Sequence, residues 1–266
     1  VEWGWLIRYM HSTGSSFFFI VVYLHMFRGM LYGSYKKPRE LIWIIGMLLY
    51  FCLMAEAFFG YLLPWGNMSY WAGQVIVNLF SYIPVIGETL TEWIRGDYFI
   101  SDITLNRFFA FHVIFLPLAI LALVFAHILA LHHVGSNNPD GIEIKDYKDE
   151  SGKPIDGVAF HPFHTSKDLV AIIIFLILYF AAVFYAPEMG GLFLEVDNFE
   201  PADPLKTPEH IVPSWYFTPY YAILRAIPNA ALGAVFLVTA VLLFVFLPWL
   251  DRCSVKSIRY RGWQYK

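Results

Sequence analysis

Four of the nine histidines fall inside long apolar runs of the chain. His11 and His25 share one run and are 14 residues apart, whereas His112 and His127 share another and are 15 apart. At about 100° per helical residue, 14 residues return to within about 40° of the starting face and 15 to within about 60°. Each run therefore presents two imidazoles on one stripe, roughly 21–23 Å apart along the helix. Two such helices facing each other would form two bis-imidazole sites at different depths.

A pair of imidazoles from opposite helices suits the iron of a haem, whose flat ring fills the space between them. Gly14 and Gly29 leave room for such a ring close to the backbone of the first run. Arg8, Arg28 and Arg107 lie near the ends of the runs, where a guanidinium can bind a propionate. A single intramembrane histidine is more simply a packing residue bonded across helices. Four at matched depths favour cofactor ligands, because ionisable groups inside a membrane are costly.

The elements that carry these residues are predicted to be membrane-spanning helices. The chain is 58% apolar and only 15% charged, whereas soluble domains are about one quarter charged. Five apolar segments are long enough to cross a hydrocarbon core of about 30 Å; they lie near 4–32, 41–63, 104–133, 168–187 and 230–250. The net charge of −3 gives no indication of nucleic-acid binding. The two cysteines imply no disulfide framework, and no C-x-x-C-H motif for covalent haem occurs.

The connections between these segments indicate the topology. Most of the 18 Lys and Arg residues follow the first, third and fifth segments, so this side, side N, is predicted to be cytoplasmic or matrix. The opposite side, side P, carries residues 67–101, whose two amphipathic stretches indicate helices lying on the membrane surface. Side P also carries the proline-rich connection 187–228. Residues 140–157 are polar and rich in turn formers, and indicate a solvated loop.

Five motifs carry a family resemblance: RYMH (8–11), GYLLPWG (60–66), RFFAFH (107–112), GSNNP (135–139) and AILRAIP (222–228). Together they resemble cytochrome b of the quinol-oxidising cytochrome bc complexes, over nearly the whole chain. The resemblance implies an all-α transmembrane bundle made of the family's helices B to F. The family's first and last helices have no counterpart here, and the chain lacks an initiator Met, so we expect a fragment. It would comprise a di-haem region at 1–167 and a C-terminal region at 168–266 that holds the quinol-site connection.

The resemblance assigns two non-covalent b haems. His11 and His112 would bind the low-potential haem near side P, and His25 and His127 the high-potential haem near side N. Gly46 and Gly60 are also expected to contact the cofactors. Electron flow in the family is bifurcated: one quinol electron goes to a Rieske iron–sulfur protein, and the other crosses both haems to a second quinone.

The resemblance also implies two quinone sites. The quinol-oxidation site on side P would be built from Phe58, Tyr61, Trp71, Gly73, Ile76, Pro213, Trp215, Tyr216 and Tyr221. The quinone-reduction site on side N would lie around His132, Ser136, Lys167 and Asp168. The implied partners are the Rieske protein, a cytochrome c-type subunit, a second copy of the chain and the lipid bilayer. The long loop near 141–157 favours a bacterial inner membrane over a mitochondrial one.

Simpler roles remain open for several of these residues. Trp71 and Tyr216 could be aromatic residues of the membrane interface. Lys167 and Asp168 could be a surface pair at the start of a helix, where the helix dipole favours the carboxylate. A pairing of His132 with Asp168 gives the stronger chemical account, because an imidazole and a carboxylate can deliver protons to a reduced quinone.

Two departures from the family pattern bear on mechanism. The 15-residue spacing in the third segment resembles that of the plastid-type relative, and we expect a kink at Pro117 to absorb the extra residue. The family motif Pro-Glu-Trp-Tyr, whose Glu is thought to take a quinol proton, becomes Pro-Ser-Trp-Tyr with Ser214. Glu56 lies inside the second segment, where a bare carboxylate is heavily penalised. We hypothesise that Glu56 replaces the missing base from the opposite wall of the pocket; the alternative is a protonated structural Glu bonded to a neighbouring helix.

Two other functions compete with quinol oxidation. A di-haem membrane anchor that passes electrons between quinone and a peripheral dehydrogenase would need no side-P pocket. A non-redox transporter would use its histidines only as hydrogen-bonding groups. The Pro-Ser-Trp-Tyr connection and Glu56 argue against the first, and the matched histidine depths argue against the second.

Overall fold

The computed structural model describes residues 1–265, in which helices and turns are joined by loops and β pairing is limited to two isolated bridges. The predicted all-α class is confirmed. Two compact units interleave along the chain. Unit 1 comprises 1–43, 127–187 and the C-terminal segment from Leu247, and unit 2 comprises 44–126 and 188–246. The division predicted between residues 167 and 168 stays a prediction.

Four helices of the described chain are long and apolar enough to cross a membrane. They are α1 (Gly4–Leu31), α2 (Glu40–Leu62), the continuous helix Asp102–Val134 and the helix Phe160–Tyr185. The third contains α5 (Asp102–Ala110) and α6 (Leu116–Val134), and the fourth contains α7 (Thr165–Tyr185). These match four of the five predicted segments.

The fifth segment does not form one long helix. It begins as α9 (Ala230–Val245), breaks at Phe246 and resumes as α10 (Leu247–Leu250). The 16 residues of α9 rise about 24 Å, less than a hydrocarbon core of about 30 Å. Pro248 lies in the first turn of α10, where its missing N–H is tolerated. The predicted fifth segment is thus present as a shorter apolar helix followed by a separate turn of helix.

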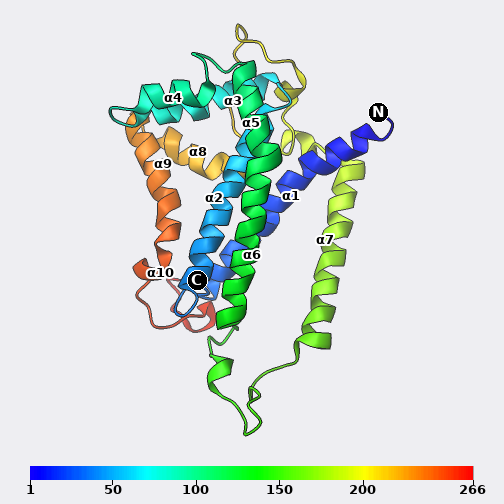
Figure 1. Cartoon of the computed structure of the whole chain (residues 1–266), viewed down its shortest axis with the longest axis vertical. Helices are drawn as coiled ribbons and strands as arrows, with labels where there is room; N and C mark the ends of the chain where they lie inside the picture. Colours follow the sequence, from blue (N-terminus) through cyan, green and yellow to red (C-terminus); the bar gives the residue numbers. More distant parts are fainter. Residues whose placement is uncertain (266) are drawn as a thin grey trace. The chain divides into compact units, whose positions relative to one another are not determined.

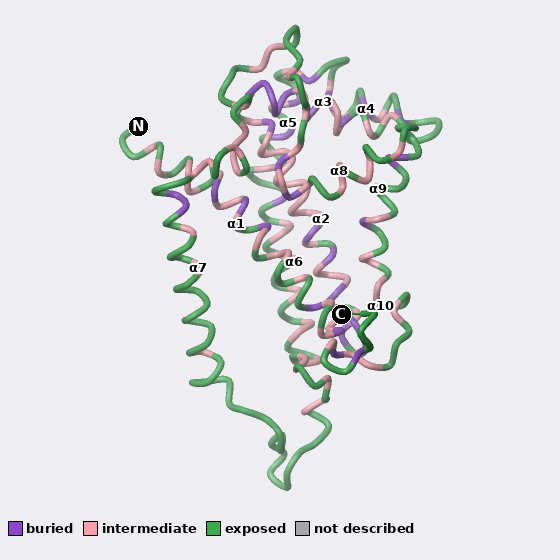
Figure 2. Tube along the Cα trace, turned by 180° about the vertical axis from the view of Figure 1, so that it is seen from behind, coloured by how far each residue is buried: buried purple, intermediate pink, exposed green. Residues whose placement is uncertain are grey.

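Surfaces of the long helices are apolar and exposed, as a lipid environment requires. Figure 2 shows α7 exposed along nearly all of its length. Its side chains Ile172, Ile173 and Ile177 are each more than half exposed. Soluble monomers rarely carry a contiguous apolar surface of this extent. Length, composition and exposure therefore agree that this is an integral membrane protein.

The third long helix contains a π-helical turn at Phe111–Phe115 (η2), and His112 lies within it. Pro117 explains the place of this turn: it has no N–H to donate to the carbonyl of Val113, and its ring clashes with that carbonyl. A π turn accommodates one residue more than α geometry does. The extra residue between His112 and His127 was expected to be absorbed near Pro117, and the wide turn lies immediately before it.

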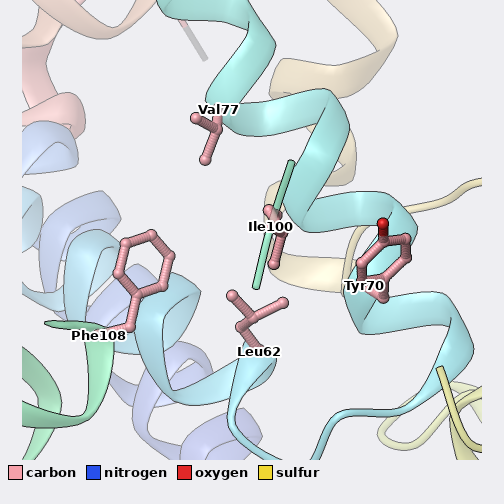
Figure 3. Close-up of a cluster of buried hydrophobic side chains, with 5 residues drawn as sticks. All are labelled: Leu62, Tyr70, Val77, Ile100 and Phe108. Carbon is pink, nitrogen blue, oxygen red and sulfur yellow. The ribbon is translucent and has the colours of Figure 1, made fainter. Parts of the chain in front are cut away.

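Most of the shorter elements of unit 2 contact one another (Figure 1). The shorter elements are α3 (Asn67–Asn78), α4 (Gly87–Arg95), α8 (Thr218–Ala226) and the short turns η1 (Leu79–Tyr82), η5 (Met189–Gly191), η6 (Val196–Phe199) and η7 (Trp215–Phe217). Figure 3 shows the buried cluster that joins α2, α3 and α5, namely Leu62, Tyr70, Val77, Ile100 and Phe108. The face of α3 that carries Tyr70 and Val77 is thereby fixed against α2. This cluster holds the two amphipathic helices predicted in 67–101.

In unit 1, α1 packs on α7 through aromatic residues (Figure 1). The ring of Phe17 meets Phe175 and Tyr179 edge-on, with centroids 5.8 Å and 5.5 Å apart. The Tyr179 hydroxyl donates to the backbone carbonyl of Met10 over 2.6 Å. Gly14 lies beside the same tyrosine, where an added Cβ would make an ordinary contact at 3.5 Å. These contacts fix the helix that carries His11 and His25.

Two ion-pair groups tie the C-terminal segment to the rest of unit 1. Asp251 accepts from Lys36 at 2.9 Å and from Arg261 at 2.6 Å. Glu143, at the edge of the turn η3 (Ile144–Asp146), accepts from the two terminal guanidinium nitrogens of Arg39 at 2.8 Å each. It also accepts from Lys256 at 2.7 Å. The Arg39 side chain is only 4% exposed, so its charge needs this partner. The remaining turns of unit 1 are η4 (Phe160–His164) and η8 (Ile258–Tyr260).

Candidate functional site

His25 on α1 and His127 on α6 face each other within unit 1, with ring centroids 6.3 Å apart and planes at 73°. A metal–nitrogen bond of about 2.0 Å places an imidazole centre about 3 Å from the metal, so two rings on one iron are about 6 Å apart. The spacing therefore fits a single metal ion held between the two rings.

His112 lies against α2 within unit 2. Its Nδ1 lies 2.8 Å from the backbone carbonyl of Glu56. Because a carbonyl only accepts, Nδ1 carries the proton, and Nε2 is the basic nitrogen of the neutral ring. Metal-binding histidines are commonly oriented by this kind of hydrogen bond. Gly60 makes the close approach possible, since a Cβ there would overlap the His112 ring.

The fourth predicted ligand, His11, lies on α1 in unit 1, whereas His112 belongs to unit 2. The pairing of His11 with His112 stays a prediction. Arg8 and Arg28 are exposed on α1. Arg107 is also exposed and donates to the carbonyl of Trp93. Their predicted role toward haem propionates is likewise untested.

The predicted glycines have different surroundings. An added Cβ at Gly29 would make an ordinary contact with Trp43 at 3.5 Å. Gly46 lies in α2, fourteen residues before Gly60 and on about the same face. Among these positions, Gly60 has the closest contact with a predicted ligand.

An apolar cavity of about 370 Å³ lies in unit 2 between α2, α3, the 211–217 segment, α8 and α9. Its volume is in the range of small-molecule sites. Four residues predicted for the quinol site line it: Phe58, Ile76, Pro213 and Tyr221. Other lining residues, such as Met54, Ala55 and Leu224, were not predicted from the sequence. Their side chains are apolar and unreactive, so the sequence gives no indication that they line a binding site.

The other residues predicted for this site lie around the cavity rather than on its wall. The Trp71 indole donates to the carbonyl of Asp203 over 3.1 Å. Gly73 packs tightly on Leu62 and Ile100 of the buried cluster. Tyr216 is 5% exposed, and its ring packs edge-on against Trp215. The contacts of Trp71 and Gly73 hold α3, whose Ile76 lines the cavity.

Glu56 does not line the cavity. Ala55, its neighbour, faces the cavity, and one residue turns a helix by about 100°. The Glu56 carboxylate lies 3.2 Å from His112 Nδ1, and its second oxygen is buried without a partner among the described residues. Glu56 is thus not among the residues that line this cavity, and its predicted role as the replacement base stays a prediction. The contact with His112, on another helix, corresponds to the alternative of a Glu bonded to a neighbouring helix.

A different carboxylate, Glu195, meets the Pro-Ser-Trp-Tyr segment. Tyr61 Oη donates to Glu195 Oε2 over 2.9 Å, and the Ser214 side chain donates to the same carboxylate. Burial raises the pKa of Glu195, while the two hydrogen bonds act in the opposite direction. Glu195 was not predicted from the sequence, although its place after the apolar residues Leu192, Phe193 and Leu194 in the long connection was a usable signal.

The residues predicted for the quinone-reduction site lie on separate elements of unit 1. His132 is exposed in the last turn of α6, and Asp168 is exposed in the first turn of α7. The Lys167 ammonium lies 4.2 Å from the centre of the Phe163 ring. The Ser136 carbonyl accepts from Arg39. Within the described residues these contacts do not join His132 to Asp168, so their pairing stays a prediction.

The family description "Cytochrome b/b6/petB" matches residues 1–135, and "Cytochrome b(C-terminal)/b6/petD" matches residues 201–266. The chain belongs to the cytochrome b family. It is 60% identical to a cytochrome b of Allochromatium vinosum over 272 residues, which cover 98% of this chain and 65% of that protein. It is 49% identical to the cytochrome b of Rhodospirillum rubrum, covering 98% of this chain and 62% of that one. This chain thus spans slightly less than two thirds of these cytochrome b relatives.

A solved structure titled "Hyperthermophilic respiratory Complex III" has the same fold as this cytochrome b family member. The TM-score is 0.89 at 42% identity, over 98% of this chain and 67% of that one. The resemblance proposed from the five motifs is confirmed at the level of the family. Membership implies b-type haem, and bacterial relatives indicate the plasma membrane as its location.

Proposed function

We propose that this chain is the electron-transfer subunit of a quinol–cytochrome c oxidoreductase. It oxidises quinol on side P and passes electrons through two b haems to a quinone on side N, with proton translocation. The observation that carries the proposal is the facing pair His25 and His127, whose ring centroids lie 6.3 Å apart in membrane helices.

The haem-binding residues would be His25 with His127, and His11 with His112. When bound, haem supplies a one-electron carrier within the membrane. The protein holds and orients the ligands: the Glu56 carbonyl fixes the tautomer of His112, and Gly60 lets that ring approach α2. The packing of α1 on α7 fixes the helix that presents His11 and His25.

Quinol would bind in the apolar cavity of unit 2. A quinol is a flat apolar ring with two hydroxyl groups, and the cavity offers aromatic and aliphatic walls from Phe58, Ile76 and Phe217. Exclusion of water there would keep the reacting ring away from solvent oxidants. A di-haem anchor without quinol oxidation at this side would have no use for such a cavity, which favours the oxidoreductase over that rival.

The second quinone would react on side N near His132, Ser136, Lys167 and Asp168. The chemistry of an imidazole and a carboxylate supports proton delivery there. The proposed partners are a Rieske iron–sulfur protein, a cytochrome c-type subunit and a second copy of the chain. The likeness to a Complex III structure supports a multi-subunit assembly.

The test is made on the intact complex containing the full-length protein. A reduced-minus-oxidised spectrum should show two b-type haems per chain, and quinol should reduce cytochrome c in an inhibitor-sensitive reaction. A folded, pure complex without haem would overturn the proposal and return the transporter to consideration. Two haems without quinol oxidation would instead support the di-haem anchor.

A further inference from the structure

The Pro-Ser-Trp-Tyr segment contains no base, yet the fold brings a carboxylate to its serine. Ser214 is only 6% exposed, and its side chain donates to Glu195. The second donor to the same carboxylate is the Tyr61 hydroxyl, which comes from the end of α2 over 2.9 Å. Glu195 thus links two segments that contribute to the cavity wall. One is α2, which carries Phe58, and the other is the segment that carries Pro213.

The walls of the cavity themselves contain no carboxylate or histidine among the described residues. Their titratable groups are Tyr220 and Tyr221. The Tyr221 hydroxyl donates to the carbonyl of Ile211, and the Tyr220 hydroxyl is hydrogen-bonded to that of Tyr50. Neither phenol is an effective base near neutral pH. A proton leaving a molecule in the cavity therefore needs an acceptor beyond this wall. Besides Glu195, further candidates are Glu209 and His210, which line the adjoining cavity that shares Tyr221 and Leu224 with this one.

Ser214 follows Pro213, which lines the cavity, and is itself buried without lining it. A serine hydroxyl can accept one hydrogen bond while it donates another. Its own donation is directed to Glu195. Glu195 is half-buried rather than enclosed, so it also has a route to water. Tyr61 is the titratable group that contacts this carboxylate, and Asp197 and Tyr216 act electrostatically on Tyr61.

We propose that Glu195 is the proton acceptor for quinol oxidation in this chain, reached through Ser214 and held in place by Tyr61. It supplies the carboxylate that the family motif provides at position 214. This inference rests on the proposed function. In the balanced step, quinol loses two electrons and two protons and becomes quinone. One electron and one proton go to the iron–sulfur partner. The other electron would go to the haem chain, and the other proton goes to the Glu195 carboxylate and from there to water.

The test compares Glu195→Gln with Glu200→Gln in the intact complex. Glu200 is an exposed acid in the same connection, so its variant controls for the loss of a negative charge. We expect Glu195→Gln to lower kcat for quinol oxidation at least tenfold with little change in KM. The rise of rate with pH, which requires an ionised carboxylate, should disappear in this variant. Both haem spectra should persist, which separates this result from loss of structure.

A relocation test makes the proposal sharper. Adding Ser214→Glu to the Glu195→Gln variant places a carboxylate at the position used by the family, and should restore most of the rate and the rise with pH. Tyr61→Phe removes one hydrogen bond to Glu195 and should slow oxidation less than Glu195→Gln does. If the Glu195→Gln complex fails to assemble, Glu195→Asp is tested instead. We expect this variant to oxidise quinol more slowly, with a rate that still rises with pH.

Several outcomes would overturn the inference. One is that Glu195→Gln leaves both kcat and the pH profile unchanged. Another is that the rate of the Glu195→Asp variant no longer rises with pH. Another is a large loss of rate in Glu56→Gln with none in Glu195→Gln, which would return the role to Glu56. These outcomes differ from failure of the proposed function, in which the unaltered complex itself would not oxidise quinol.

Discussion

Gly60 on α2 and His112 in the π turn are in close contact: the imidazole ring of His112 occupies the space that a Cβ on residue 60 would need. We expect Gly60→Ala to displace His112 and to lower the haem content from two per chain to one. The measurement is a haem count with a reduced-minus-oxidised spectrum. Gly4→Ala is the matched control, because its added Cβ would meet only Val1 at 3.7 Å. Two intact haems in Gly60→Ala would contradict a role of His112 as a ligand held by this contact.

His25 and His127 should bind one and the same haem. His25→Ala and His127→Ala are each expected to remove the same spectral component, since a bis-imidazole site needs both ligands. The exposed neighbour His133 serves as the control, and His133→Ala should leave both components intact. If the two ligand variants remove different components, the pair does not share an iron.

The apolar cavity predicts a steric effect on quinol. Ala55 lines it, so Ala55→Phe should fill part of its volume and raise KM for quinol about tenfold, equivalent to ~1.4 kcal/mol. Leu48→Phe adds a ring at an exposed position of the same helix and should leave KM unchanged. Steady-state kinetics over a range of quinol concentrations makes the comparison. An equal response of both variants would place quinol elsewhere.

Glu143 links Arg39 and Lys256, and these hydrogen bonds lower its pKa from the ordinary 4.5 to about 2, with the bond from Arg39 the largest cause. Because the folded-state pKa is depressed, the stabilisation is present above pH 4.5 and is lost as pH falls toward 2. Glu143→Gln should cost about 1.5–3 kcal/mol at pH 7 and reduce the acid sensitivity of unfolding. Thermal melting at pH 7 and pH 3.5 tests this, with the exposed Glu150→Gln as control. A melting temperature that is unchanged at pH 7 would show that the bridge contributes nothing.

Sequence patterns located the long helices because spans are set by length and hydropathy. Such patterns do not resolve where an apolar run breaks, and the interruption at Phe246 depends on local backbone geometry just before Pro248. The surface helices of 67–101 were predictable from amphipathicity, whereas their attachment through Leu62 and Ile100 depends on long-range packing.

The candidate site was predicted unevenly for the same reason. Helical periodicity placed His25 on the same face of its helix as His11, and His127 on the same face of its helix as His112. The structure brings the rings of His25 and His127 together. Glu56 shows the limit of that approach, since its depth was evident but its direction, toward His112 and away from the cavity, was not. Glu195 lies in an irregular connection without any period, so its contact with Tyr61 could come only from the folded chain.

The wide turn at Phe111–Phe115 has a consequence for how such helices can evolve. In a strict α-helix, a single inserted residue would rotate everything beyond it by about 100° and point a downstream ligand at lipid. A π turn absorbs the extra residue within one widened helical turn. The helix beyond it is therefore not rotated, although the interval between His112 and His127 is one residue longer. A search pattern with one fixed interval between paired histidines would therefore discard chains whose ligands are arranged in the same way.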